Sequence, residues 1–307
     1  MRLLITGATG FVGAATVRRA LETGDEVAVL IRDPARPSRL TPQLPQVAMF
    51  VADLRDAVAV GTALAAFRPE AVLHLAWAGV SGAARNDPSQ VYDNLVPTVR
   101  LVDLSARHGV GKFVGLGSQG EYGPLDTVIS ETDRPQPTTL YGTSKLATAL
   151  ISERMAALSG QQFAWLRLFS TYGPGDSEIW MIPSIIGQLL RGERPKTTAG
   201  TQLWDYLYID DVADGILAAT RSEAAVGVFN LGSGKPVAVR WIIETIRDLI
   251  DPDADIGFGE VPFRPDQVMH MEADITRLTS LTGWEPKVDF RDGLQRTVAA
   301  MRERAHD

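Results

Sequence analysis

The sequence predicts an α/β fold in which a doubly wound parallel sheet precedes a smaller C-terminal lobe. Over residues 1–170, short apolar runs alternate with stretches of helical spacing, which is typical of strands joined by helices in a parallel sheet. Several runs are apolar throughout, as expected for strands that helices cover on both faces. Beyond residue 170, glycine and proline become frequent and the expected helices shorten. We therefore divide the chain into residues 1–170 and a lobe of residues 171–307, from which some segments return to the sheet.

The first unit contains the strands and the long helices that support this prediction. The expected strands are residues 3–6, 26–31, 47–51, 71–76, 112–117 and 163–168. One long helix is expected over residues 88–108, and a second over residues 141–158, where Gly160 stops it. Because no stretch resembles a flexible linker, the two parts of the chain are expected to pack across a cleft, where ligands tend to bind.

The composition restricts the kind of function. The 307 residues include no cysteine and only four histidines, so disulfides and cysteine nucleophiles are excluded and no metal site is expected. A formal net charge of −7 disfavours nucleic acid and anionic membranes as partners. The longest nearly unbroken apolar run, residues 71–80, is about half the length of a membrane span. Because Arg2 to Thr6 run straight into Gly7 and leave no room for a cleavable signal, we expect a cytoplasmic protein.

A glycine-rich turn follows the first strand. Gly7, Gly10 and Gly13 have the spacing G-x-x-G-x-x-G between an expected strand and an apolar-periodic helix. Glycines at these positions permit a tight turn and a close backbone approach to a pyrophosphate, which the helix N-terminus faces. This context favours a dinucleotide site over an ordinary strand–helix turn. The expected cofactor-binding residues here are Gly7, Thr9, Gly10, Phe11, Val12 and Gly13.

The residues after the second strand bear on which dinucleotide is expected. Arg32 and Asp33 would lie over the adenosine ribose. An arginine accommodates a 2′-phosphate, whereas an aspartate accepts a hydrogen bond from a 2′-hydroxyl. Arg36 and Arg39 follow closely and make this corner basic. NADP(H) is therefore favoured, with Arg32 as its contact, while NAD(H) bound through Asp33 and a solvated basic loop are the alternatives.

Three further residues have the chemistry of a proton-transfer site. Tyr141 and Lys145 form Y-x-x-x-K, which places both side chains on one face of a helix. An ammonium beside a phenol lowers the pKa of the phenol, so that Tyr141 exchanges a proton with a carbinol or carbonyl oxygen near neutral pH. Ser118 ends the fifth strand and would donate a hydrogen bond to the same oxygen. We predict that all three are catalytic and that Tyr141 and Lys145 also contact the cofactor.

Joined to the glycine motif, these residues resemble the extended short-chain dehydrogenase/reductase family, in its nucleotide-sugar epimerase/dehydratase branch. The resemblance covers nearly the whole chain and implies a Rossmann domain followed by a substrate-binding lobe. Residues 168–174, 205–211, 264–266 and 283–286 also match segments of that branch. Asn94, Asp211 and Trp284 also match positions of that branch. Each of them either has the role that the resemblance implies or is a structural residue that caps or packs. The further cofactor contacts that the resemblance implies are Asp53, Leu54, Leu75, Ala76 and Asn94.

Departures from the family pattern narrow the chemistry. Family members that dehydrate a hexose carry an Asp-Glu pair directly after the catalytic hydroxyl residue, because removing water needs an acid and a base. This chain has Gln119 and Gly120 there, so a 4,6-dehydratase is not expected. Glu121 stands where an aliphatic residue is common, and it either faces a sugar hydroxyl or is an exposed loop carboxylate.

The expected diphosphate site also departs from the family. Trp204 and Ser170 stand where many relatives have arginine and asparagine. Diphosphate binding is therefore expected to rest on the guanidinium of Arg264, in an R-P-x-D segment that ends at Asp266. The expected substrate-binding residues are Gln119, Glu121, Ser170, Trp204 and Arg264.

The function predicted from these residues is that of a nucleotide-sugar oxidoreductase, most concretely an NADPH-dependent 4-ketoreductase of a nucleoside-diphosphate 4-keto-6-deoxyhexose. Tyr141 would protonate the oxygen as hydride reaches the keto carbon. An NAD-dependent nucleotide-sugar 4-epimerase would use the same residues and is the nearest alternative. A non-catalytic dinucleotide sensor and a reductase of aromatic or steroid ketones are further alternatives. The resemblance also implies a homodimer through the two long helices, whose apolar residues exceed what one covered face requires.

Overall fold

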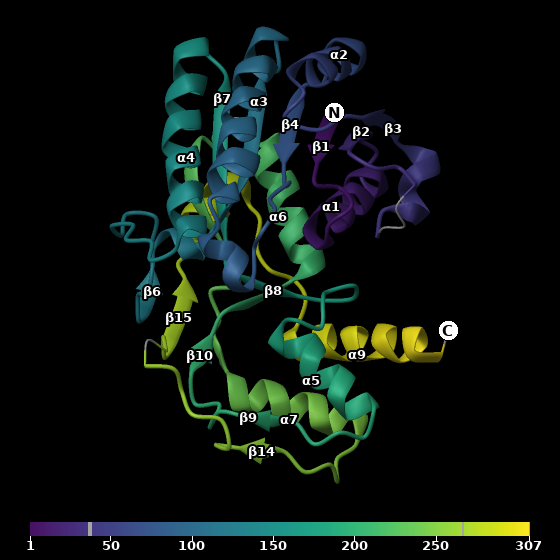
Figure 1. Cartoon of the computed structure of the whole chain (residues 1–307), viewed down its shortest axis with the longest axis vertical. Coiled ribbons are helices and arrows are strands. Elements are labelled where there is room, and N and C mark those ends of the chain that lie inside the picture. Colours follow the sequence, from purple (N-terminus) through teal and green to yellow (C-terminus); the bar gives the residue numbers. More distant parts are fainter. Residues whose placement is uncertain (36–38, 266, 307) are drawn as a thin grey trace.

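A seven-stranded parallel sheet forms the centre of the molecule (Figure 1). The computed structural model describes residues 1–35, 39–265 and 267–306, so Arg36 and Asp266 lie outside the described residues. The strand order is β12-β7-β5-β4-β1-β2-β3, and every neighbouring pair is parallel. Strands extend in both directions from β1, which confirms the doubly wound fold. The strands are β1 (Arg2–Thr6), β2 (Glu26–Ile31), β3 (Ala48–Val51), β4 (Ala71–His74), β5 (Lys112–Ser118), β7 (Gln162–Leu168) and β12 (Gly227–Leu231).

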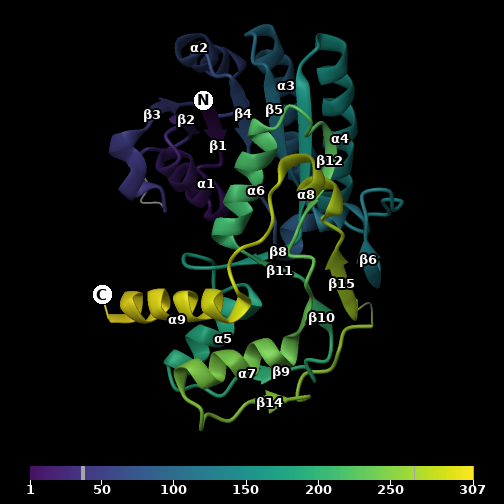
Figure 2. The same ribbon diagram turned by 180° about the vertical axis from the view of Figure 1, so that it is seen from behind.

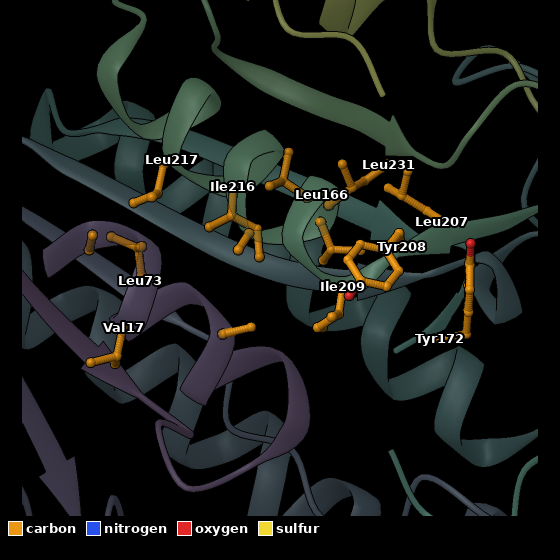
Figure 3. Packing of buried hydrophobic residues seen from close by; sticks show 14 of the residues in the cluster. Val17, Leu73, Leu166, Tyr172, Leu207, Tyr208, Ile209, Ile216, Leu217 and Leu231 are labelled. Carbon is orange, nitrogen blue, oxygen red and sulfur yellow. The ribbon is translucent and has the colours of Figure 1, made fainter. Parts of the chain in front are cut away.

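Helices cover both faces of this sheet (Figures 1 and 2). They are α1 (Phe11–Glu22), α2 (Ala57–Phe67), α3 (Val96–Arg107), α4 (Leu140–Ser159) and α6 (Ile209–Arg221). Leu3 and Ile5 of β1 belong to the core that contains α1 and α6, whereas Leu4 belongs to the core that contains α2, α3 and α4. Figure 3 shows part of the first core, including Val17 of α1 and Ile216 of α6. Because alternate residues enter two buried cores, the strand sequences are apolar throughout.

The six strands expected from the sequence are all present, with shifts at their ends. The fourth strand ends at His74 and the fifth runs on to Ser118. The second long helix is α4, which ends at Gly160 in the left-handed conformation with a φ of 74°. The first long helix divides into a π-helical segment, η3 (Gln90–Leu95), and α3.

A smaller lobe lies below the carboxyl edge of the sheet in Figure 1. Its helices α5 (Met181–Leu190), α7 (Val239–Ile250) and α9 (Phe290–His306) pack against one another. Three small sheets accompany them, with the orders β13-β10-β15-β6, β11-β8 and β14-β9. None of the helices in the described ranges is long and apolar enough to cross a membrane. The other strands and α-helix of the described residues are β6 (Thr127–Ile129), β8 (Ser170–Tyr172), β9 (Lys196–Thr197), β10 (Leu203–Trp204), β11 (Tyr206–Tyr208), β13 (Val237–Ala238), β14 (Gly257–Phe258), β15 (His270–Ala273) and α8 (Thr276–Thr282).

Two strands pair with a strand from the other side of the sequence boundary at residue 170. β12 comes from the second half and pairs with β7, whereas β6 comes from the first half and pairs with β15. The buried carboxylate of Asp205 strengthens this junction. It accepts hydrogen bonds from the backbone N–H groups of Ser233 at 2.7 Å, Gly234 at 2.9 Å and Ala273 at 3.0 Å. One carboxylate therefore fixes the turn after β12 against the end of β15.

Two residues of the family segments have structural roles in the fold. Asp211 accepts hydrogen bonds from the backbone N–H groups of Lys287 at 3.1 Å and Val288 at 3.0 Å. The Trp284 ring is buried against Gly215, where an added Cβ would lie 3.0 Å from the ring. Of the two roles left open by the sequence, these contacts favour the structural one for both residues: Asp211 binds the backbone before α9, and Trp284 packs against α6.

Candidate active site

The glycine-rich turn lies between β1 and α1, at the carboxyl edge of the sheet. Gly7 has a φ of +74°, and its carbonyl accepts a 2.9 Å hydrogen bond from the N–H of Gly10. A Cβ on Gly7 would lie 2.5 Å from the backbone nitrogen of Ala76, and one on Gly13 would lie 2.1 Å from the Gly7 oxygen. Only glycine fits these two positions. Because α1 begins at Phe11 without a side-chain cap, its N-terminal N–H groups fit a pyrophosphate.

The adenosine side of the site is expected at the ends of β2 and β3. Arg32 and Asp33 are exposed after β2, and the Asp33 carboxylate accepts a 3.0 Å hydrogen bond from the N–H of Ala35. Asp53 follows β3 and pairs with Arg55 at 2.9 Å. The hydrogen bond from Arg55, with help from the charge of Arg32, lowers the pKa of Asp53. The Asp53 carboxylate is therefore paired with Arg55, and Arg32 stays exposed after β2.

The other residues predicted around the adenosine and the turn divide between the surface and the interior. Arg39 donates from Nε to the Gly175 carbonyl at 2.5 Å, so it is engaged by the second half of the chain. Leu54 packs against the core that contains α2, whereas Phe11 and Val12 pack against the core that contains α1. Thr9 is exposed at the turn.

The nicotinamide side is expected at the end of β4. Leu75 and Ala76 are half-buried directly after this strand. Below them, the two ring nitrogens of His74 are each 2.8 Å from a hydroxyl, of Thr6 on one side and of Thr98 on the other. Burial lowers the pKa of His74 to about 3, so the ring is neutral near pH 7. His74 therefore ties β4 to β1 and α3 beneath this edge.

Asn94 holds the loop that follows β4. Its Oδ1 accepts the N–H of Ala78 at 2.8 Å, and its Nδ2 donates to the Ala78 carbonyl at 3.2 Å and to Oε1 of Gln90 at 3.3 Å. Gln90 Oε1 also accepts a 2.8 Å hydrogen bond from the Trp77 indole. These contacts give Asn94 a structural role, and its cofactor contact stays a prediction.

The predicted catalytic residues gather beyond the end of β5. Ser118 ends β5, Gly120 lies in the short helix η4 (Gln119–Glu121), and Tyr141 lies in the first turn of α4. A Cβ placed on Gly120 would lie 3.4 Å from Ser118 Oγ and 3.5 Å from the Tyr141 ring carbon Cε1. Lys145 lies one turn further along α4, where its Nζ donates to the Leu116 carbonyl. The fold therefore brings a hydroxyl, a phenol and an amine to one edge of the sheet.

Burial has the largest effect on the protonation of these groups. It raises the pKa of Tyr141, and the Ser118 hydroxyl and the Arg85 guanidinium oppose this rise. It lowers the pKa of Lys145 to about 7, while the charge of Glu121 opposes that change. The sequence analysis expected Lys145 to lower the pKa of the phenol, but its Nζ is directed to a backbone carbonyl. Lys145 instead gains and loses its own proton near neutral pH.

The expectation for Glu121 is corrected by its burial. The side chain is fully buried and forms a 2.8 Å ion pair with Arg167 of β7. It also accepts hydrogen bonds from the Ser118 N–H and from the Trp165 indole, each at 2.9 Å. Gly117 makes room for it, because a Cβ there would lie 2.5 Å from Glu121 Oε1. Glu121 therefore neither contacts a sugar hydroxyl nor lies exposed in a loop.

The remaining predicted substrate residues lie on both sides of the site. Gln119 Oε1 accepts a 3.0 Å hydrogen bond from the Ser118 hydroxyl. The Trp204 indole donates to Ser170 Oγ at 2.8 Å, so these two residues come together in the smaller lobe. Arg264 is exposed in the segment between β14 and β15. Their substrate contacts stay predictions.

Two residues at the site were missed by the sequence analysis. The Trp77 ring lies edge-on to the Tyr141 ring at 6.2 Å, and Lys145 Nζ lies 3.8 Å above the Trp77 centroid. The Arg85 guanidinium lies 4.9 Å from the centroid of Tyr141. Both residues follow β4 in the chain, so a search of the loops after the predicted strands could have found them.

Proteins of known name resemble this chain over nearly its whole length. Residues 3–232 match the NAD dependent epimerase/dehydratase family. The UDP-glucose 4-epimerase of Thermotoga maritima, with UDP-glucose, is 27% identical with a TM-score of 0.87, over 99% of this chain and 100% of that chain. The UDP-glucose 4-epimerase of Thermus thermophilus, in complex with NAD, is 28% identical with a TM-score of 0.86, over 98% and 99%. A dTDP-glucose 4,6-dehydratase of Streptomyces griseus is 30% identical over 97% of this chain and 93% of its own length.

The buried ion pair gives a stability prediction. Replacing Glu121 with valine leaves the Arg167 guanidinium buried without a carboxylate, which we expect to lower the free energy of unfolding by about 3–5 kcal/mol. Urea denaturation at neutral pH measures this loss. The matched control is Glu193→Val, which breaks an exposed pair with Arg191 and should leave the free energy of unfolding nearly unchanged. A cost for Glu121→Val as small as that of the control would contradict the structural role of the pair.

Proposed function

The chain belongs to the NAD-dependent epimerase/dehydratase family, and on this premise we propose that it is a nucleotide-sugar 4-epimerase that retains NAD. The observation that carries the proposal is the convergence of Ser118 and Tyr141 near Gly120, at the sheet edge that also holds the glycine turn. Full-length likeness to two 4-epimerases supports this function over the 4-ketoreductase that the sequence analysis favoured.

The cofactor we propose is NAD rather than NADP. The NADP preference predicted from Arg32 has no support in the comparisons, whereas a relative of matching length is described in complex with NAD. Of the basic corner expected from the sequence, Arg39 donates to the Gly175 carbonyl, whereas Arg32 is exposed after β2. The exposed Asp33 beside it is the residue that would accept a hydrogen bond from the 2′-hydroxyl of NAD.

In the proposed mechanism the chain's own residues move a proton while the cofactor accepts and returns a hydride. The Tyr141 phenol takes the proton of the sugar 4-hydroxyl during oxidation and returns one during reduction. The Ser118 hydroxyl holds the same oxygen by a hydrogen bond. Lys145, with a pKa of about 7, supplies positive charge on the same helix face when it is protonated. Between the two half-reactions the keto sugar must turn its other face toward the cofactor.

A 4,6-dehydratase is the second candidate, because a relative of that name is 30% identical to this chain. Loss of water from adjacent sugar carbons needs an additional acid and base beside the catalytic hydroxyl. Gln119 and Gly120 stand at those positions, and neither side chain can exchange a proton. This difference favours the epimerase.

The nucleotide portion of the substrate is proposed to bind to the smaller lobe formed by α5, α7, α9 and the small sheets, which include Ser170 on β8. Trp204 and Ser170 are already hydrogen-bonded there. The exposed Arg264 guanidinium suits a diphosphate. The sugar would then extend from this lobe toward Tyr141.

The proposed function predicts a specific turnover. Purified protein, without added cofactor, should interconvert the 4-epimers of at least one UDP-linked sugar in a panel of hexoses and hexuronates. Chromatography of the sugar nucleotides should show both epimers, with no net change in nicotinamide absorbance, because hydride leaves and returns within one cycle. Consumption of added NADPH by a 4-keto sugar would instead indicate a ketoreductase, and release of water would indicate a dehydratase.

A second prediction concerns the proton. Tyr141→Phe should lower kcat by about 10²–10⁴-fold while leaving bound NAD unchanged, because the ring remains and only the transferable proton is lost. Ser118→Ala should be milder, and Tyr92→Phe, at an exposed tyrosine, should match the wild type. Turnover rates and the NAD content of denatured samples measure both properties. A loss below about tenfold for Tyr141→Phe would mean that another group supplies the proton.

We also propose a homodimer through η3, α3 and α4. Val96 of α3 and Leu150, Ile151 and Leu158 of α4 are 41%, 60%, 41% and 71% exposed, which leaves large apolar side chains uncovered on two helices that pack against each other. Light scattering at micromolar concentration should give twice the 33.2 kDa chain mass. Leu150→Glu should shift the mass toward one chain, and a monomeric wild type would contradict the proposal.

A further inference from the structure

Arg85 lies beside the predicted catalytic residues. It belongs to the short helix η2 (Gly82–Asn86) in the loop between β4 and η3. A Cβ placed on Gly120 would lie 3.3 Å from an Arg85 Nη atom, compared with 3.4 Å from Ser118 Oγ and 3.5 Å from the ring of Tyr141. The guanidinium is therefore next to the two side chains that would hold the reacting sugar oxygen.

The chain provides no carboxylate for this guanidinium within the described residues. None of their ion pairs includes Arg85, and its buried Nε has no hydrogen-bond partner. The nearby carboxylate of Glu121 is engaged with Arg167. Asp87, two residues along, accepts a hydrogen bond from the N–H of Ser89. A charged group in such a place is normally paired, so the missing anion is expected from a ligand.

We infer that Arg85 is a specificity-determining residue that binds a carboxylate on the sugar, so that the preferred substrate is a nucleotide-linked hexuronic acid. This inference rests on the proposed function, in which Tyr141 and Ser118 hold the oxygen on C4. The carboxylate of a hexuronic acid is attached to C5, next to that carbon, whereas the diphosphate is attached to C1 across the ring. A guanidinium beside the C4 oxygen is therefore placed for the carboxylate, which it can bind through two parallel hydrogen bonds.

Arg85 has one other role to test against this, namely an effect on Tyr141 itself. Its positive charge opposes the burial that raises the pKa of the phenol. In that role it would assist every substrate equally. In the role inferred here it discriminates between a sugar that carries a carboxylate and one that does not.

The experiment compares UDP-glucuronate with UDP-glucose as substrates of the wild type, Arg85→Gln and the control Arg107→Gln. Arg107 lies on α3, is 72% exposed and pairs with Asp103, so its loss removes a guanidinium elsewhere on the protein. We expect the wild type and the control to favour UDP-glucuronate in kcat/KM by at least about tenfold, and Arg85→Gln to lose that preference. Preference of the wild type for UDP-glucose, or an equal loss with both sugars in Arg85→Gln, would overturn the inference.

Binding separates this inference from the proposed function. Calorimetry with UDP-glucuronate should show Kd about tenfold weaker for Arg85→Gln than for the wild type, while the Kd for UDP-glucose stays within about twofold. Arg85→Lys should recover part of the affinity, because it keeps the charge and loses the fork. If neither sugar is epimerised, the proposed function fails, and these affinities still decide the role of Arg85. Equal affinities for the wild type and Arg85→Gln would overturn it.

Discussion

The buried ion pair between Glu121 and Arg167 is the contact on which the edge of the sheet that holds the candidate active site depends. One carboxylate joins β5, β7 and η4, because it also accepts the Ser118 N–H and the Trp165 indole. A charge in an apolar interior is tolerated only when it is paired and hydrogen-bonded, which restricts this junction to one arrangement. The backbone of Ser118 is thereby fixed. The charge of Glu121 also raises the pKa of Lys145 and so opposes the larger effect of burial, which lowers it.

The smaller lobe is connected to this edge through exchanged strands rather than through a linker. β12 returns to the central sheet beside β7, and β6 leaves the first half to pair with β15. Asp205 then ties the turn after β12 to β15 through backbone hydrogen bonds. Trp204 lies on β10, which pairs with β15, and it donates a hydrogen bond to Ser170 on β8, two residues after β7 ends. The predicted nucleotide-sugar residues are therefore connected to the strands that flank Ser118. A substrate held by the lobe would therefore have a fixed direction of approach to the catalytic edge.

Features set by local spacing could be predicted from the sequence, and features set by distant pairing could not. The turn from Gly7 to Gly13 and the helical pair of Tyr141 with Lys145 depend on geometry within one turn or one helix. In the sequence Glu121 resembled a loop carboxylate, because its partner Arg167 lies 46 residues further along the chain. The pairing of β5 with β7 brings the two residues together. The sequence analysis did not predict β12 as a strand of the central sheet, because β12 also joins the sheet by pairing with a distant segment, β7. Arg85 follows no periodic pattern, so its place beside the phenol becomes visible only in the folded loop.

The distinction between a reductase and an epimerase illustrates how far catalytic residues alone can define a reaction. A phenol that gives a proton to a keto oxygen also removes it from the carbinol, so Ser118, Tyr141 and Lys145 suit either direction. The difference lies in whether the reduced cofactor stays bound until the sugar has turned. Residues that hold the cofactor and the sugar substituents therefore decide the outcome. Among the described residues, Arg85 has no carboxylate partner, and its buried Nε has no hydrogen-bond partner. Because this guanidinium lies beside Ser118 and Tyr141, a test of substrate recognition at Arg85 bears directly on the reaction.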